Sequence, residues 1–189
     1  LSHIRRLNDP LKSKLYRTND TMEMKYYIFG YFLTRYWAFK VKKINFYYDL
    51  VVCKQDFFYF PLQVVPEVSA NLWAPNSQNF LETIRATAMN LPGKYTLVVK
   101  EHPVMIGWRD PKFYKKISNL PNIKIVSPSL TSDEIIRNPK CIGVITASGT
   151  TGFESVVLGK LAFTFAPMFY NELPNSAHIT NINDINKIL

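Results

Sequence analysis

The sequence has few cysteines and no pattern that would use them. Its two cysteines, Cys53 and Cys141, both lie in apolar, strand-like runs, and no CxxC or Cys/His ligand spacing occurs. A signal-peptide pattern is also missing, and the aromatic stretch over 26–40 is too short to span a bilayer and contains Arg35. These absences favour a cytoplasmic protein whose cysteines are small buried side chains in a reducing compartment.

What the sequence does contain indicates a soluble domain with a basic N-terminal part. The chain has 189 residues, 47% of them hydrophobic, and a mean hydropathy of −0.07, which suits one domain plus an appendage. Residues 1–50 hold ten Lys or Arg against four acids, so they provide most of the formal net charge of +9. This excess could face an anionic membrane surface, an acidic glycan or simply solvent. Nucleic acid is a weaker candidate, because the charge is not interleaved along the rest of the chain and no RNP-like motif is present.

From about residue 55 the chain alternates between strand-like and helix-like patterns. Apolar runs predict strands over 56–65, 95–103, 123–128, 141–147 and 161–167. Helical spacing and helix end signals predict helices over 78–91, 111–120, 131–138 and 151–158. This order predicts an α/β fold: a Rossmann-like parallel sheet with flanking helices over 55–189, preceded by a mainly helical basic segment over 1–54.

Three polar clusters follow predicted strands and should meet at one edge of such a sheet. They are 63–67, 100–103 and 148–154. Because the carboxyl ends of parallel strands share one edge, and ligands bind there, these clusters predict a binding site.

The third cluster lies in 146-TASGTTGFESVVLGK-160. A helix that begins near Thr150 or Thr151 would point its free N–H groups at the ligand edge, with hydroxyls from Ser148, Thr150 and Thr151 beside them. Gly149 and Gly152 would let the backbone approach an anion closely. The pattern therefore indicates a phosphate site, although the same hydroxyls could instead only cap the helix.

Three further residues suit a nucleotide at this edge. Glu154 falls in the first turn of the helix and could accept hydrogen bonds from a ribose diol. His102, followed by Pro103, could bond a base or ribose when neutral, or neutralise a leaving phosphate when protonated. Lys100 is either a partner of His102 in the site or a surface residue.

The motifs PLQVVPE, VKEHP, ASGTTGFESVVLGK and APMFY together resemble the capsule polysaccharide biosynthesis proteins, which include Kdo transferases of the two-domain GT-B fold. The resemblance covers roughly 57–175 and implies a domain that binds a cytidine nucleotide-activated sugar, CMP-Kdo or similar. It implies that His102 and Pro103 flank the nucleotide, that 148–151 hold its phosphate, and that Glu154 lies at the ribose. Where this chain reads PLQVVPE, the family more often reads PLHYQPE, which affects the positions expected to contact the donor sugar or acceptor; Gln63, Glu67 and Lys100 are the candidates for such contacts.

The resemblance also implies what this chain lacks. As the C-terminal, donor-binding half of a glycosyltransferase, it would be a fragment without the acceptor domain and without the catalytic base or nucleophile. His102 would then only stabilise the leaving group, no metal or other cofactor is expected, and the acceptor would be a glycan or glycolipid at the inner face of the plasma membrane, reached through residues 1–54. Two other interpretations stay open: an enzyme like UDP-N-acetylglucosamine 2-epimerase, and a non-catalytic polysaccharide-binding or assembly module.

Overall fold

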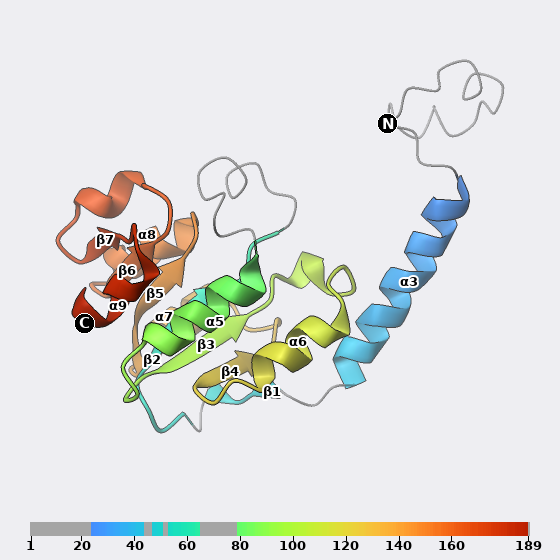
Figure 1. The fold of residues 1–189 in the computed structure, drawn as a ribbon, viewed down its shortest axis with the longest axis horizontal. Helices are drawn as coiled ribbons and strands as arrows, with labels where there is room; N and C mark the ends of the chain where they lie inside the picture. Colours follow the sequence, from blue (N-terminus) through green and yellow to red (C-terminus); the bar gives the residue numbers. More distant parts are fainter. Residues whose placement is uncertain (1–23, 44–46, 51–52, 65–78, 189) are drawn as a thin grey trace, which may run out of the picture.

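The computed structural model describes residues 24–43, 47–50, 53–64 and 79–188. Its centre is a seven-stranded sheet in the order β1-β4-β3-β2-β5-β6-β7, and every neighbouring pair of strands is parallel (Figure 1). The strands are β1 (Tyr47–Tyr48), β2 (Phe57–Pro61), β3 (Thr96–Lys100), β4 (Ile123–Val126), β5 (Cys141–Thr146), β6 (Leu161–Thr164) and β7 (Ser176–His178). The α/β fold with a parallel sheet is thus confirmed.

Helices cover both faces of the sheet. They are α5 (Phe80–Asn90), α6 (Pro111–Ser118), α7 (Ser132–Arg137), α8 (Thr150–Val157) and α9 (Ile185–Ile188), with short 3₁₀ turns at η3 (Pro103–Met105), η4 (Phe169–Glu172) and η5 (Ile182–Asp184). In Figure 1, α5, α6 and α9 lie in front of the sheet, while α7 and α8 lie behind it. All four helices expected from the sequence form within one or two residues of their predicted bounds.

The strands are buried because their side chains alternate between two hydrophobic layers. Phe58 and Phe60 of β2 pack in the layer shared with α5 and α6, and Phe57 and Tyr59 pack in the layer shared with α7. All four side chains have no exposed surface. The continuous apolar runs therefore mark a sheet buried on both sides, as the sequence predicted.

Two edge strands were not expected from the sequence. β1 comes from the segment assigned to residues 1–54, yet it pairs with β4 through Tyr47↔Ile125 and Tyr48↔Val126. β7 follows the last predicted strand and pairs with β6. Strands of two or three residues are too short to show alternation, so the pattern of the sequence did not reveal them. The sheet therefore begins before residue 55, which corrects the expectation that the whole of 1–54 lies outside it.

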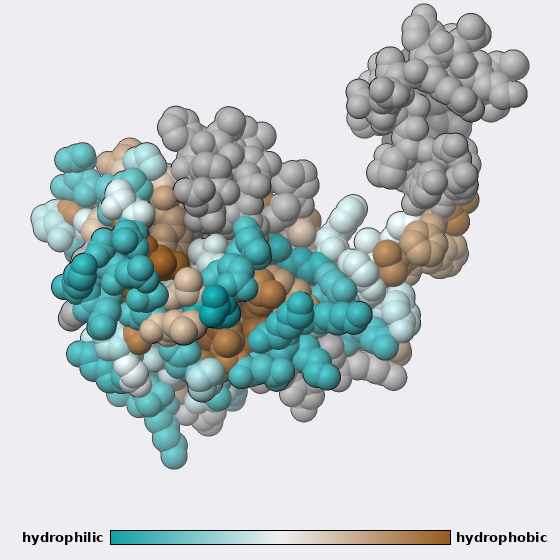
Figure 2. All heavy atoms as spheres, viewed as in Figure 1, coloured by the Kyte–Doolittle hydropathy of each residue, from teal (hydrophilic) through white to brown (hydrophobic). Residues whose placement is uncertain are grey.

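The helix α3 (Met24–Lys43) stands apart from the sheet and confirms a helical stretch in the N-terminal segment. Its inner side meets Gly107, where an added Cβ would collide with the Thr34 backbone and lie 3.0 Å from the Ala38 Cβ. It exposes large apolar side chains, among them Phe29 and Phe32. Figure 2 shows brown, hydrophobic surface along this helix. Within the described residues, no helix is both long and apolar enough to cross a membrane.

Candidate functional site

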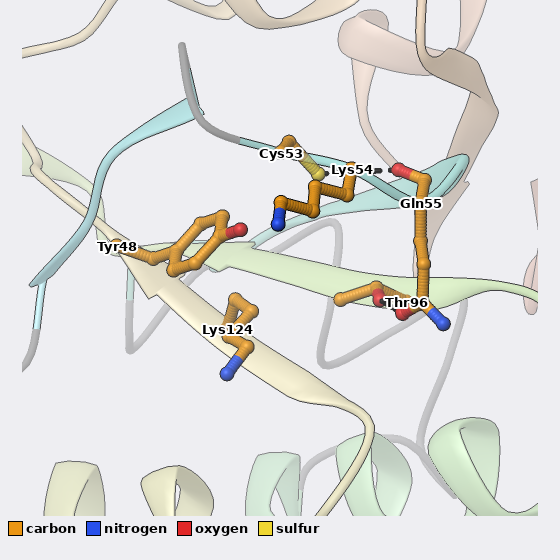
Figure 3. A pocket seen from close by; sticks show the side chains of 6 residues that line it. All are labelled: Tyr48, Cys53, Lys54, Gln55, Thr96 and Lys124. Carbon is orange, nitrogen blue, oxygen red and sulfur yellow. Dashed lines mark hydrogen bonds between the residues drawn. The ribbon is translucent and has the colours of Figure 1, made fainter.

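Two hollows lie at opposite ends of the strands, and the larger one has little binding chemistry. It has a volume of about 640 Å³ and lies near the amino ends of β2 and β3 (Figure 3). Its polar groups largely satisfy one another: the Cys53 thiol donates to the Gln55 carbonyl at 3.2 Å, and the Thr96 hydroxyl donates to the Gln55 side chain at 3.0 Å. The Lys124 ammonium lies 5.2 Å from the centre of the Tyr48 ring.

The second hollow, which we call the edge pocket, has a volume of about 490 Å³ and lies at the carboxyl ends of β2, β3 and β5. The residues singled out by sequence that line it are Gln63, Lys100, His102, Ser148, Gly149, Thr150 and Thr151. They come from three separate stretches of the chain, which the parallel sheet brings to one edge. The predicted convergence of the three polar clusters is therefore observed for all of these positions.

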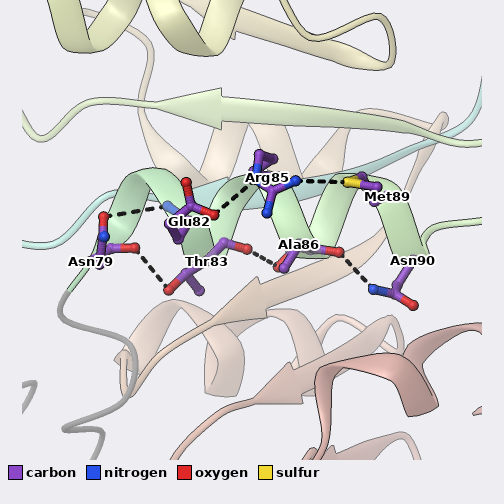
Figure 4. A network of polar contacts seen from close by, with 8 residues as sticks. Asn79, Glu82, Thr83, Arg85, Ala86, Met89 and Asn90 are labelled. Atoms are coloured by element: carbon purple, nitrogen blue, oxygen red, sulfur yellow. Dashed lines mark hydrogen bonds and ion pairs between the residues drawn. The ribbon is translucent and has the colours of Figure 1, made fainter.

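The helix α8 begins at the edge pocket without a side-chain cap. Gly149 is its N-cap residue, and none of the described side chains accepts a hydrogen bond from the first turn. Three other helices of the sheet differ: Asn79 caps α5 (Figure 4), Asp110 caps α6, and Thr131 forms a capping box at α7. The idea that the hydroxyls around Gly149 serve only to cap the helix is thus wrong. The uncapped N–H groups and the positive end of the helix dipole suit an anion.

The two glycines of this turn have different roles. Gly149 lines the pocket, and a Cβ there would lie 3.0 Å from the Thr146 hydroxyl. Gly152 is buried instead beneath Tyr170, where a Cβ would lie 2.9 Å from the phenol carbon Cζ. The Tyr170 hydroxyl in turn donates to the Gly149 carbonyl at 2.7 Å. The expectation that Gly152 opens the backbone to a ligand is corrected: it makes room for the side chain that holds the turn.

His102 lines the pocket, and the side chain of the preceding residue, Glu101, holds the His102 backbone in place. The Glu101 side chain, only 1% exposed, accepts hydrogen bonds from the His102 N–H at 2.7 Å and the Tyr114 hydroxyl at 2.8 Å. The Glu101 carboxylate also forms an ion pair with Arg109, whose Nε lies 2.7 Å from Oε2. Burial raises the pKa of the Glu101 carboxyl, while Arg109 and the hydrogen bonds oppose that shift.

Arg109 extends this buried network to the neighbouring strand. Its Nη2 donates to the Gln63 carbonyl at 2.6 Å, and its guanidinium lies 4.9 Å from the centre of the Phe80 ring. The Glu101–Arg109 pair therefore connects His102, after β3, with Gln63, after β2, and fixes two walls of the pocket relative to each other. Sequence reasoning missed both residues, because the role of each depends on a partner brought close only by the fold.

The wall beside α7 was also not foreseen in full. Tyr59 and Ser132 line the pocket together with Lys100, and the Tyr59 and Ser132 hydroxyls are hydrogen-bonded at 3.1 Å. Burial raises the pKa of the Tyr59 phenol. Thr146 lines the pocket floor, and its hydroxyl has no hydrogen-bond partner; the side-chain oxygen of Gln63 is likewise unpaired.

Two of the predicted residues, Pro103 and Glu154, do not line the pocket, and a third is not among the described residues. Pro103 is exposed at the start of η3, where the adjacent His102 ring accepts a hydrogen bond from the Val104 N–H at 3.3 Å. Glu154 is exposed on α8, outside the set of lining residues, although its charge adds to the raised pKa of Tyr59. Glu67 falls outside the described residues. Among the described residues, no cluster of three or more His, Cys, Asp or Glu side chains is arranged to hold a metal ion.

Comparison with known proteins shows the family to which the chain belongs. The family model for capsule polysaccharide biosynthesis proteins matches residues 7–173. The chain belongs to that family. Protein FixF of Sinorhizobium fredii is 30% identical over 122 residues, which make up 61% of this chain and 27% of the relative. The family member studied here therefore spans about a quarter of the length of that curated relative.

Solved structures share the fold at low sequence identity. The beta Kdo 2,7 transferase domain of Thermosulfurimonas dismutans KpsC superposes with a TM-score of 0.54 and 19% identity, over 78% of this chain and 46% of that one. UDP-GlcNAc 2-epimerase from Methanocaldococcus jannaschii also gives a TM-score of 0.54, with 15% identity over 82% of this chain and 40% of that one. This chain thus has a fold found in about half of each larger, GT-B-like protein.

Proposed function

We propose that this capsule-family chain is the donor-binding domain of a glycosyltransferase and that its edge pocket binds a cytidine nucleotide-activated sugar, CMP-Kdo or similar. The observation that carries the proposal is the uncapped start of α8 at a pocket that also contains His102. An anionic phosphate suits the free N–H groups of this turn and the hydroxyls of Ser148, Thr150 and Thr151. Family membership and the fold shared with Kdo transferases support the same proposal.

In this proposal the pocket acts through binding and electrostatics. The helix N-terminus stabilises the negative charge that develops on the departing nucleotide phosphate, and His102 assists when it is protonated. Glu154 and Pro103 flank the ribose and base from the rim. The catalytic base or nucleophile and the glycan or glycolipid acceptor belong to parts of the enzyme beyond this pocket.

The proposal is tested by nucleotide-dependent protection against thermal unfolding. CMP should raise the unfolding midpoint more than UMP or GMP does, because a ligand that binds only the folded state stabilises it. His102→Ala should abolish most of this shift without changing the midpoint of the free protein. The matched control is His178→Ala, since His178 is exposed at the end of β7 and lies outside the pocket. The absence of a shift with any nucleotide would refute the proposal.

A UDP-sugar epimerase is the second candidate, because its fold superposes on this chain as well as that of a Kdo transferase does. Stronger protection by UDP than by CMP would favour it. The third interpretation, a polysaccharide-binding module without catalysis, requires that nucleotides leave the midpoint unchanged while anionic glycan raises it.

We also propose that the protein works at the cytoplasmic face of the membrane and contacts it through the N-terminal segment. The described part of this segment, α3, exposes Phe32 and Phe39 and contains no acidic residue. Aromatic side chains beside lysines and arginines suit an anionic membrane interface. Sedimentation with anionic vesicles should fall for Phe32→Ser and Phe39→Ser, and unchanged sedimentation would contradict the proposal.

A further inference from the structure

Lys100 places a buried positive charge in the wall of the edge pocket. Its side chain is only 8% exposed, yet it lines the pocket at the end of β3. The ammonium donates one hydrogen bond, to the Leu130 carbonyl at 2.9 Å, and an ammonium has three donors. With respect to the described residues, two of its donors are therefore available to a ligand.

Within the part of the chain that the structure describes, no carboxylate forms an ion pair with this charge. Glu134 acts on Lys100 electrostatically, but its own carboxylate accepts hydrogen bonds from the Thr131 N–H at 2.6 Å and the Thr131 hydroxyl at 2.8 Å. A buried charge without a paired partner is costly, so a site that keeps one needs an external anion to offset the cost.

Lys100 lies at the end of a different strand from the one that leads into α8. In the sheet, β2 separates β3 from β5, so the ends of β3 and β5 are about 10 Å apart. The ammonium donates to the carbonyl of Leu130, in the connection between β4 and α7. The Tyr59 and Ser132 hydroxyls lie on the same wall, and when Tyr59 donates their shared hydrogen bond, the Ser132 hydroxyl can donate to an anion.

We propose that Lys100, Ser132 and Tyr59 form a second anion subsite, which binds a negatively charged group of the donor other than the phosphate held at α8. The inference rests on the proposed function, because it assigns a second charged group to the same donor. That group is either a carboxylate on the transferred sugar or a second phosphate on the nucleotide. In both cases the pocket selects a donor with two separated anionic groups over a nucleoside monophosphate.

The test compares three ligands by isothermal titration calorimetry with wild type, Lys100→Met and Lys160→Met. CMP has one phosphate, CDP has two, and CMP-Kdo has one phosphate and a sugar carboxylate. Lys160 is the matched control, because its ammonium donates to the Asn138 and Cys141 carbonyls, at 2.8 Å each, outside the pocket. Lys100→Met should weaken binding of the doubly anionic ligand about tenfold to a hundredfold while changing CMP affinity much less. A loss confined to CMP-Kdo identifies the carboxylate, and a loss confined to CDP identifies the phosphate.

Several results would overturn the subsite. The proposed subsite is wrong if Lys100→Met leaves all three affinities unchanged. It is also wrong if the substitution lowers the affinity for CMP as much as the affinities for the other ligands. Failure of wild type to bind any of the three would instead refute the proposed function itself. Ser132→Ala provides a second variant that removes only a hydroxyl, and it should weaken the doubly anionic ligand by about threefold to tenfold. The free Lys100→Met protein should unfold at the same temperature as wild type or higher; a clear decrease would indicate a structural lysine.

Discussion

The hollow at the amino ends of the strands and the edge pocket differ in chemistry more than in size. The hollow at the amino ends of the strands is the larger, at about 640 Å³ against about 490 Å³ for the edge pocket. Its lysines, Lys54 and Lys124, lie near solvent or over an aromatic ring, and its thiol and hydroxyl already have protein partners. The edge pocket has an uncapped helix start, a buried ammonium and unpaired polar atoms. Unpaired buried groups indicate a binding site better than volume does.

The largest expected effect comes from breaking the buried network behind the edge pocket. Glu101→Gln leaves the Arg109 guanidinium without its carboxylate, and we expect a loss of about 3 kcal/mol or more in the free energy of unfolding. Asp56→Asn is the matched change at the amino ends of the strands, where the Asp56–Lys140 pair spans 3.6 Å and both side chains are about half exposed. Its cost should stay below about 1 kcal/mol. Urea denaturation of both variants measures the two losses in the free energy of unfolding, and equal losses would contradict the prediction.

A smaller loss is expected from Gly152→Ala. The added methyl would collide with the Tyr170 phenol, which outweighs the gain in helix propensity, so we expect about 1–3 kcal/mol of destabilisation. Gly93→Ala is the control, because Gly93 lies in the turn before β3 and has open space around it. Its midpoint should shift little in a thermal melt. A stable Gly152→Ala protein would show that the turn is not tightly held.

Tyr170→Phe should remove about 1 kcal/mol at neutral pH, because it deletes the hydrogen bond to the Gly149 carbonyl. Burial raises the pKa of Tyr170 to about 12. The folded protein therefore keeps a proton that the unfolded chain loses above its ordinary value of about 10, so this stabilisation is complete below pH 10 and is lost as the pH rises toward 12. Stability curves at pH 8 to 12 should show the two proteins converging. Stability curves that stay parallel over this pH range would contradict the raised pKa of Tyr170.

The smallest effect concerns Cys53, which lies in the hollow at the amino ends. It is partly exposed, whereas Cys141 is buried and burial raises the pKa of its thiol to about 11. A thiol reagent should therefore label Cys53 first and Cys141 only on unfolding. Saturating CMP should leave the Cys53 rate unchanged within about twofold, because the nucleotide is proposed to bind at the opposite end of the strands. Strong protection by CMP would place the ligand in the wrong hollow.

Much of the fold was predictable from local patterns, because they reflect burial. The five central strands are apolar on both faces, and the helix ends are marked by residues such as Pro111 and Gly159. The edge strands β1 and β7 were not predictable, since two or three residues show no periodicity and pair only because the neighbouring strand presents free backbone groups.

Some residues of the candidate site were also predictable from the sequence, and others were not. His102 and the turn at 148–151 were identified because their spacing and their position after strands are local properties. Tyr59 and Ser132 were not, because they lie 73 residues apart and share a pocket wall only in the folded chain. Glu154 shows the converse: the sequence placed it in the first turn, but α8 begins at Thr150, so Glu154 lies beyond that turn and outside the set of lining residues.

By itself the sequence determined that a parallel sheet would form and that polar clusters would lie along its carboxyl edge, because hydrophobic periodicity and helix signals act over a few residues. Only the tertiary structure decided which polar groups are left without partners. Glu101 became the centre of a buried network, and Lys100 became a buried ammonium without an ion pair among the described residues, because of the neighbours that packing brought to them. Hydrogen-bond partners are set by contacts across the sheet, and local spacing does not specify those contacts.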